Sequence, residues 1–123
     1  MTEIIENLFV GDLNDAQSGF DGLIVCVLPE GPIDETPNVA WIPFLAEGIG
    51  SLDITASVID NALTGGRRVL VHCGSGSERA PLTVAWFLNR RRAMSPDAAY
   101  DLLKSKRPII QDRRLWLRQY LEQ

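Results

Sequence analysis

The sequence is poor in cysteine and histidine, and this scarcity excludes several classes of protein. Cys26, Cys73 and His72 are the only residues of these two types among 123. They are too few for a disulfide-rich scaffold, a four-ligand Cys/His zinc site or a multi-histidine metal centre. No apolar run approaches the roughly 18 residues of a bilayer span, and the acidic N-terminal segment lacks the basic start of a signal peptide. We therefore expect a cytoplasmic protein with no membrane partner.

Basic residues are missing from the first half of the chain. Residues 1–66 carry 11 acidic and no basic side chains, whereas residues 67–123 carry all 12 Lys and Arg and only 5 acidic side chains. An anionic ligand is therefore expected to bind the second half. Most of the basic residues are interpreted as solvated ends and faces of helices. With a formal net charge of −4 and no nucleic-acid motif, we expect no nucleic-acid partner.

Short apolar runs bounded by turn residues predict the strands of a buried sheet. They are Leu8–Val10, Gly22–Leu28, Val39–Phe44 and Val69–Val71. Runs of this kind, without alternation, are typical of parallel strands buried on both faces. Helical patterns lie between and after them. We therefore predict a single domain over residues 1–123 with an α/β fold of three layers, in which a central, mostly parallel sheet of four to five strands is flanked by helices.

Four stretches combine apolar residues at helical spacing with residues that begin or end helices. They are residues 51–63, a segment that begins near Arg79, residues 95–104 and residues 113–121. Ser51, Ser95 and Asp112 are the predicted N-caps, and Pro81 fits only the first turn of a helix. The segment after Arg79 is apolar on nearly every face, which predicts a central, buried helix.

The link between the strand at 69–71 and the helix near Arg79 is the segment most informative about chemistry. Its two glycines permit the backbone conformations with which a loop turns several N–H groups toward an anion. The helix N-terminus adds further N–H groups, and Arg79 can bind two oxygens in a bidentate manner. The expected anion-binding residues are Gly74, Ser75, Gly76, Ser77, Glu78 and Arg79, with the Glu78 side chain turned outward.

His72 and Cys73 stand where the strand enters this loop. Amide dipoles and a guanidinium favour the thiolate of Cys73 over the thiol, so Cys73 is the candidate nucleophile. Successive strand residues point to opposite faces, so His72 is expected to face away from Cys73. His72 is therefore predicted to support the loop backbone through a hydrogen bond, not to act as the base of a cysteine protease.

The motif His72-Cys73-x-x-Gly76-x-x-Arg79 resembles the signature loop of cysteine-dependent protein phosphatases, in particular the small dual-specificity branch. The likeness extends to Leu8–Gly11, Trp41–Phe44 and the segment from Met94 to Pro108. The resemblance implies a phosphomonoester hydrolase of the tyrosine or dual-specificity type. Cys73 would attack phosphorus, Arg79 and the loop amides would stabilise the transition state, and water would hydrolyse the phosphocysteine intermediate.

The resemblance also implies the partners of the protein. A phosphorylated protein or a small phosphomonoester would be the substrate, and phosphate or another oxyanion would bind in the loop. No metal or other cofactor is expected, because an arginine and backbone dipoles can neutralise the phosphate dianion. Short loops imply a shallow pocket, and we expect a monomer.

Two departures from the family pattern point to slow turnover. The family usually has Ser or Thr directly after the signature arginine, where its hydroxyl helps the cysteine leave, but this sequence has Ala80, as in the phosphatase-of-regenerating-liver group. The expected aspartic acid beyond Pro43-Phe44 aligns with Leu45 or Ala46. Glu47 is the nearest candidate for the general acid and Asp53 a more distant one, and an enzyme without either is the third alternative.

Other hypotheses stay open at this point. The two departures are also compatible with a catalytically weak pseudophosphatase module that binds phosphate or phosphoproteins. A cysteine in an anion-binding loop also suits a sulfur- or arsenate-handling enzyme. Cys26, within an apolar run, is interpreted as a small buried residue. A reversible disulfide between Cys26 and Cys73, as in some relatives of the family, is the alternative.

Overall fold

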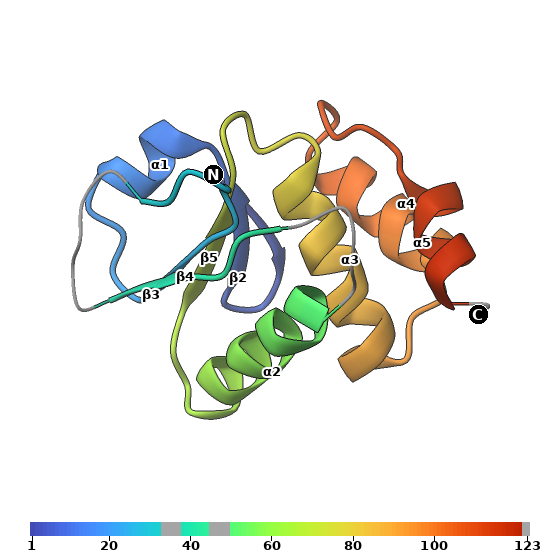
Figure 1. Ribbon diagram of the computed structural model, residues 1–123, viewed down its shortest axis with the longest axis horizontal. Coiled ribbons are helices and arrows are strands. Elements are labelled where there is room, and N and C mark those ends of the chain that lie inside the picture. Colours follow the sequence, from blue (N-terminus) through green and yellow to red (C-terminus); the bar gives the residue numbers. More distant parts are fainter. Residues whose placement is uncertain (33–37, 45–49, 122–123) are drawn as a thin grey trace.

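The central sheet has five strands. A computed structural model describes residues 1–32, 38–44 and 50–121. The strands in these ranges are β1 (Thr2–Ile5), β2 (Leu8–Gly11), β3 (Leu23–Cys26), β4 (Val39–Trp41) and β5 (Val69–His72). They are ordered β1-β2-β5-β3-β4, and within this sheet only the β1–β2 pair is antiparallel. The mostly parallel sheet predicted from the apolar runs is confirmed, and β5 lies at its centre (Figure 1).

The sequence did not predict β1, which is an edge strand. Only Ile4 is buried in it, and Glu3 and Glu6 interrupt the apolar pattern. Asn7 takes a left-handed conformation, with φ 67°, in the turn to β2. Edge strands accept charged side chains because part of their surface meets water. Apolar periodicity therefore gives little signal for such a strand.

The helices in the described ranges are α1 (Leu13–Gln17), α2 (Gly50–Thr64), α3 (Arg79–Arg92), α4 (Pro96–Lys106) and α5 (Arg114–Leu121). The four predicted helices are confirmed as α2 to α5. Ser95 caps α4 as predicted, since its hydroxyl accepts from the Ala98 N–H at 3.1 Å. None of the helices in the described ranges is both long enough and apolar enough to cross a membrane.

The N-cap predicted at Ser51 is wrong. Gly50 is already helical, so Ser51 lies inside the first turn of α2. Its hydroxyl is buried and has no hydrogen-bond partner in the described residues. An N-cap must precede the first helical residue, so Ser51 cannot be the cap of α2.

The helix α1 was not predicted, because it has five residues and none of them is buried. It begins with a capping box. The Asp12 carboxylate accepts from the Asp15 N–H at 2.8 Å, and the Asp15 carboxylate accepts from the Asp12 N–H at 3.0 Å. Reciprocal bonds of this kind stabilise a helix start without apolar periodicity.

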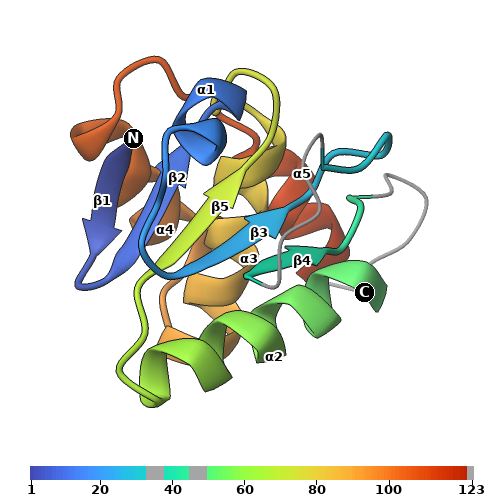
Figure 2. The ribbon, with the colours of Figure 1, turned by 90° about the vertical axis from the view of Figure 1, so that its left-hand side faces the viewer.

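The two faces of the sheet are covered unequally, as Figure 1 and Figure 2 show. On the face that we call the core face, α2 and α3 pack against the strands, and α4 packs against α3 and β1. The buried stretch Ala80–Leu88 of α3 forms the centre of this core together with Val71 and Cys73. On the opposite face, the α1 face, Ile24 and Leu70 are buried but lie outside the core cluster. The helix α3 is therefore the central, buried helix that the sequence predicted.

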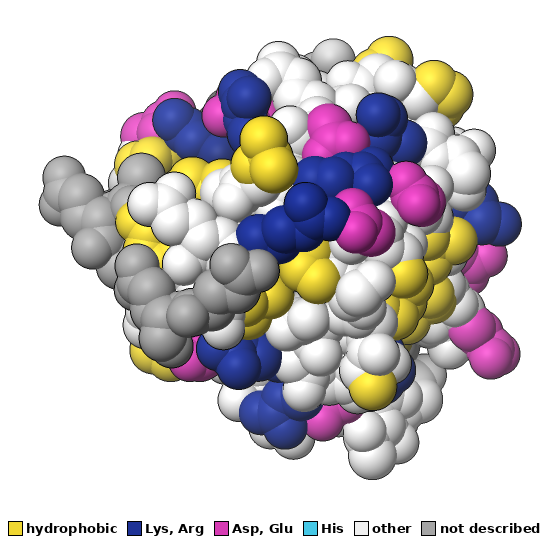
Figure 3. All heavy atoms as spheres, turned by 90° about the vertical axis from the view of Figure 1, so that its right-hand side faces the viewer, with side chains coloured by type: hydrophobic (Ala, Val, Ile, Leu, Met, Phe, Trp, Pro, Cys, Tyr) yellow, Lys and Arg dark blue, Asp and Glu magenta, His cyan; other side chains and the backbone are white. Residues whose placement is uncertain are grey.

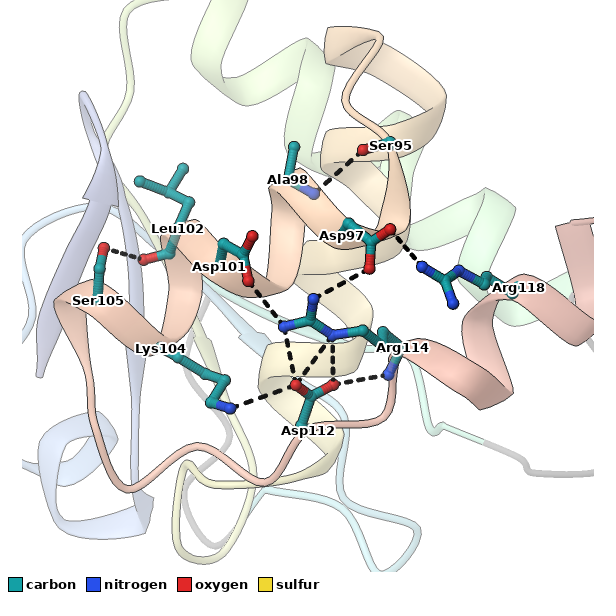
Figure 4. Close-up of polar contacts among 10 residues, drawn as sticks. All are labelled: Ser95, Asp97, Ala98, Asp101, Leu102, Lys104, Ser105, Asp112, Arg114 and Arg118. Carbon is teal, nitrogen blue, oxygen red and sulfur yellow. Dashed lines mark hydrogen bonds and ion pairs between the residues drawn. The ribbon is translucent and has the colours of Figure 1, made fainter.

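Ion pairs fasten α5 to α4 (Figure 4). The Arg114 guanidinium contacts the carboxylates of Asp97 at 3.0 Å, Asp101 at 2.9 Å and Asp112 at 2.8 Å. Arg118 also pairs with Asp97. The hydrogen bonds from Arg114 lower the pKa of Asp112 to about 2. Figure 3 shows basic and acidic side chains interspersed on this side of the molecule, in agreement with the interpretation of the basic residues as solvated helix faces.

Candidate active site

The predicted site residues meet where β5 passes through a loop into α3 (Figure 1). Cys73 directly follows β5 and is only 3% exposed. Arg79 is the first residue of α3 and is exposed. The N-terminus of a helix carries unpaired N–H groups and the positive end of the helix dipole. The strand, loop and helix expected around an anion site are therefore all present.

Four successive carbonyl groups of the loop accept hydrogen bonds from other parts of the chain. The pairs are Leu13 N–H to Gly74 (3.0 Å), the Arg107 guanidinium to Ser75 (3.4 Å) and Gly76 (3.0 Å), and Gln111 N–H to Ser77 (2.7 Å). In a trans peptide the C=O and the following N–H point in opposite directions. The N–H groups of residues 75–78 therefore face the inside of the loop.

The inward N–H groups form a set of donors for an oxyanion. No N–H of residues 74–79 donates to an acceptor within the described part of the chain. Several backbone donors that converge on one point, beside a helix N-terminus, are the usual protein site for phosphate. Because the carbonyls are held from outside, the donors are already oriented before an anion binds.

Gly76 is required by the geometry of this loop. Its φ is +69°, which favours glycine, and a Cβ there would lie 2.7 Å from both the Gly11 carbonyl oxygen and the Arg107 guanidinium. At Gly74, in contrast, a Cβ would meet nothing within 4 Å. Of these two glycines, only Gly76 is therefore needed for steric reasons.

Arg107 is the residue of this site that the sequence reasoning missed. A basic charge at the end of a helix, within the Met94–Pro108 segment of the resemblance, does not by itself predict this role. In the structure its guanidinium binds two loop carbonyls and also donates to the Thr2 hydroxyl at 2.9 Å. Arg107 therefore joins the loop to the end of α4 and to β1. The only signal in the sequence is its place directly before Pro108, where the chain leaves the helix.

The charges beside the loop leave Arg79 available to an anion. Within the described residues, the Arg79 guanidinium has no ion-pair partner. The Glu78 carboxylate instead pairs with Arg113 at 3.4 Å and is about half exposed. The outward orientation expected for Glu78 is therefore observed, and its charge is partly neutralised by Arg113.

His72 lies on the α1 face, opposite Cys73, as predicted. Its side chain is buried, and its Nδ1 lies 3.3 Å from the Cys73 carbonyl oxygen. A carbonyl oxygen only accepts, so Nδ1 must carry the proton in this bond. Burial lowers the pKa of His72, so the ring is neutral at pH 7. The expected hydrogen bond from His72 to the loop backbone is therefore present.

The candidate general acids are placed very differently. Residues 45–47, which include Glu47, lie outside the described residues. Asp53 lies on α2, and its carboxylate accepts from the Trp86 indole N–H at 2.8 Å. Trp86 stands about two turns beyond Arg79 along α3. Asp53 therefore contributes to the contact between α2 and α3, at a distance from the loop.

Cys26 ends β3 and is fully buried. It pairs in register with His72 of β5, and both cysteines are free thiols. Burial is the main cause that raises the pKa of Cys26, which keeps this thiol protonated at pH 7. These features agree with a small residue packed in the sheet, and a disulfide with Cys73 stays a prediction.

Comparison with known proteins identifies relatives among the protein phosphatases. The putative tyrosine phosphatase 123R of Invertebrate iridescent virus 6 is 28% identical over 117 residues, which cover 89% of this chain and 81% of the viral protein. Dual specificity protein phosphatase 12 of Mus musculus is 30% identical over 93 residues, which cover 76% of this chain and 24% of the mouse protein.

A solved structure and a family sequence model also match this chain. The structure of human DUSP28 superposes with a TM-score of 0.81 at 25% identity, and the match covers 99% of this chain and 96% of that chain. Residues 45–123, which contain the loop and α2 to α5, match the sequence model of the dual specificity phosphatase catalytic domain. The chain therefore belongs to the dual specificity phosphatase family.

Proposed function

We propose that Cys73, Arg79 and the loop amides of residues 74–79 carry the phosphatase activity of this family in the present chain. The observation that supports this proposal most strongly is the set of four loop carbonyls held from outside, which turns the N–H groups of residues 75–78 inward. The same loop places a cysteine at its start and, at its end, an arginine that has no ion-pair partner among the described residues. The substrates of the family are phosphorylated proteins or phosphoesters.

The reaction has two displacement steps at phosphorus. The Cys73 thiolate attacks the phosphorus, an S–P bond forms, and the bond from phosphorus to the ester oxygen breaks. The leaving oxygen takes a proton from an acid or from water. A water molecule then attacks the phosphocysteine, the S–P bond breaks, and inorganic phosphate leaves with the thiolate regenerated. Arg79 and the amides stabilise the charge on the equatorial oxygens in both steps.

The second step is the slower one in this proposal. Ala80 has no hydroxyl to assist departure of the Cys73 thiolate. Ala80 is fully buried at the start of α3, and its methyl group cannot donate a hydrogen bond to the departing sulfur. The phosphocysteine should therefore accumulate during turnover.

The catalytic unit is a single domain over residues 1–123, active as a monomer in the cytoplasm and without a metal cofactor. One buried cluster joins residues from β1 to α5, which supports a single cooperative unit. Size-exclusion chromatography with light scattering tests the monomer, and a dimer mass would contradict it. A single urea transition, followed by both tryptophan fluorescence and circular dichroism, tests the single domain.

Trapping the intermediate tests the proposed chemistry. Wild type is mixed with excess aryl phosphate, quenched in acid after one turnover and analysed by mass spectrometry. One phosphate is expected on Cys73, and none in Cys73→Ser. Cys26→Ala serves as the control, because it removes the other thiol and leaves the nucleophile. Phosphate release without any phosphocysteine, or a modified protein in Cys73→Ser, would contradict the proposal.

The general acid is proposed to be Glu47. Asp53 is less suitable, because its carboxylate accepts a hydrogen bond from Trp86 at a distance from the loop. With an ester of poor leaving group, Glu47→Gln should lower kcat/KM by about 100-fold, whereas an activated aryl phosphate should lose much less. Asp53→Asn is the matched control and should change neither substrate's rate by more than about twofold. Equal rates for Glu47→Gln and wild type on the poor leaving group would contradict the assignment.

A further inference from the structure

A cavity of about 300 Å³ lies on the α1 face of the sheet, behind the phosphate-binding loop. Its walls come from α1, from the segment that follows α1, and from the adjacent strands β5, β3 and β4, of which β4 is at the edge of the sheet. The lining includes Leu13, Ala16, Phe20, Ile24, Val39 and His72. Cys73 belongs to the opposite, core face. The cavity is therefore separate from the site that binds the phosphate, and its volume is at the lower end of those that hold small organic ligands.

His72 is the buried polar group of this cavity. It is 2% exposed and lines the cavity wall. Its Nδ1–H is used by the Cys73 carbonyl, and its Nε2 has no hydrogen-bond partner among the described residues. The neutral ring with a proton on Nδ1 has a lone pair on Nε2. This lone pair can accept a hydrogen bond from an occupant of the cavity that brings a donor.

The surroundings determine the kind of donor. The described lining contains no Lys or Arg, its polar side chains besides His72 are the exposed Gln17 and Asn38, and a charge that acts on His72 is the carboxylate of Asp12. An anionic ligand would meet no Lys or Arg in the described lining, and a cation would lose part of its hydration against the side chains of Leu13, Ile24 and Val39. A neutral N–H or O–H donor avoids both costs, and Phe20 and Ile24 offer apolar contact to the body of such a molecule.

We propose that this cavity binds a neutral, mostly apolar aromatic molecule that donates one N–H or O–H hydrogen bond to Nε2 of His72. The inference concerns a second site on the opposite face of the sheet and goes beyond the phosphatase reaction. Indoles and phenols are the simplest members of this ligand class.

Two hydrogen bonds connect the cavity to the catalytic loop. His72 donates to the Cys73 carbonyl, and Leu13, a cavity residue, donates its N–H to the Gly74 carbonyl. A donor on Nε2 polarises the imidazole and strengthens the bond from Nδ1. Contact with Leu13 and Ala16 also fixes the position of α1. A ligand in the cavity and phosphate in the loop therefore change each other's affinity by the same factor.

A pair of matched probes tests the hydrogen bond. Indole carries the N–H donor, and 1-methylindole has the same ring without it. Because His72 is the only histidine, nitrogen NMR of uniformly labelled protein reports its Nε2 and Nδ1 without overlap. Indole should bind saturably and shift the Nε2 signal, and 1-methylindole should bind at least tenfold more weakly. Equal affinity for the two probes, or no saturable binding of indole, would overturn the proposal.

Variants of the wall test the location. Ala16→Phe places a ring in the cavity and should abolish indole binding, and Val39→Phe is a second obstruction from another element if Ala16→Phe fails to fold. Ala98→Phe is the matched control, since Ala98 is exposed on α4. Indole that binds Ala16→Phe and Val39→Phe as tightly as wild type would overturn the location.

The coupling is tested with inorganic phosphate. The affinity of wild type for indole is measured by NMR with and without saturating phosphate, and the two values should differ by at least threefold. Arg79→Ala is expected to lose this difference and keep indole binding, because it lacks the clamp for phosphate. Identical affinities in wild type would overturn the coupling. None of these measurements requires turnover, so they can succeed or fail independently of the proposed reaction.

Discussion

The loop is held from two sides that are built very differently. On the core side, Arg107 and Gln111 bind three of its carbonyls, and both residues follow α4, which packs against the buried helix α3. On the α1 side, one backbone N–H and one imidazole support the start of the loop. The helix that supplies this N–H buries none of its five residues and borders a cavity.

This difference suggests a division of roles between the two sides. Dense packing and a bidentate guanidinium fix the second half of the loop, which leads to Arg79, the proposed phosphate ligand. The first half, beside Cys73, depends on a thin layer that a small molecule can fill. The rigid side should therefore determine the catalytic geometry, and the thin side should allow it to be adjusted.

Truncating a buried side chain should lower the free energy of unfolding more on the core face than on the α1 face. Ile59→Ala removes a fully buried side chain from the core face and should lower the free energy of unfolding by about 3–4 kcal/mol. Ile24→Ala on the α1 face should cost only about 2 kcal/mol, since this side chain already borders a cavity and has fewer packing partners to lose. Urea unfolding measures both values, and a larger loss for Ile24→Ala would refute the unequal packing.

A second prediction concerns the point where the loop meets β2. Gly76→Ala forces a Cβ against the Gly11 carbonyl and the Arg107 guanidinium. It should lower kcat/KM by about 100-fold, because displaced backbone N–H donors no longer stabilise the transition state. Gly74→Ala is the matched comparison and should lose no more than about fivefold. Similar losses in the two variants would show that the loop tolerates displacement at Gly76.

Variants of Arg107 test the hydrogen bonds that hold the loop on the core side. Arg107→Ala leaves the carbonyls of Ser75 and Gly76 without their donor and should lower kcat by about 10- to 30-fold with a smaller change in KM for aryl phosphate. Lys106→Ala, at the exposed neighbour, should stay within about twofold of wild type. Arg107→Lys should recover only part of the loss, because an ammonium lacks the planar fork. Full activity in Arg107→Ala would show that Arg107 is not needed to position the loop.

The ion pairs between α4 and α5 should contribute little to the free energy of unfolding. The pKa of Asp112 is lowered from 3.8 to about 2, mainly by Arg114. A lowered carboxyl pKa in the folded state stabilises the fold above pH 3.8, and this contribution disappears as the pH falls toward 2. Asp112→Asn should therefore reduce stability at pH 7 by less than about 1 kcal/mol, since the pair is partly exposed and water screens it. The difference from wild type in urea unfolding should vanish near pH 2, and a difference that persists there would exclude this cause.

The core of the fold could be predicted from the sequence because several local signals coincide there. An apolar strand, a glycine loop and a helix with Pro81 in its first turn follow one another directly, and the structure places them as β5, the loop and α3. Ser95 was identified as a cap for a similar reason, since the whole motif lies within a few residues. Local chemistry determines local structure in these places.

The remaining parts depend on contacts between distant residues or on very short elements. Arg107 lies 31 residues from Gly76 in the sequence, and no local pattern distinguishes it from other basic residues at helix ends. β1 and α1 are short, and they carry polar residues because they lie at the edge and on the thin face of the sheet. Ser51 was misplaced as a cap because its residue type fits a cap equally well at neighbouring positions.

Hydrolysis of an activated aryl phosphate by wild type, Cys73→Ser, Arg79→Ala and Cys26→Ala is the decisive test of whether Cys73 and Arg79 carry phosphatase activity. Phosphate release is followed at fixed pH under saturating substrate. We expect activity in wild type and Cys26→Ala, no measurable activity in Cys73→Ser, and a loss of at least 100-fold in Arg79→Ala. Activity that survives Cys73→Ser, or a wild type that binds phosphate through Arg79 without releasing it from the ester, would contradict this expectation.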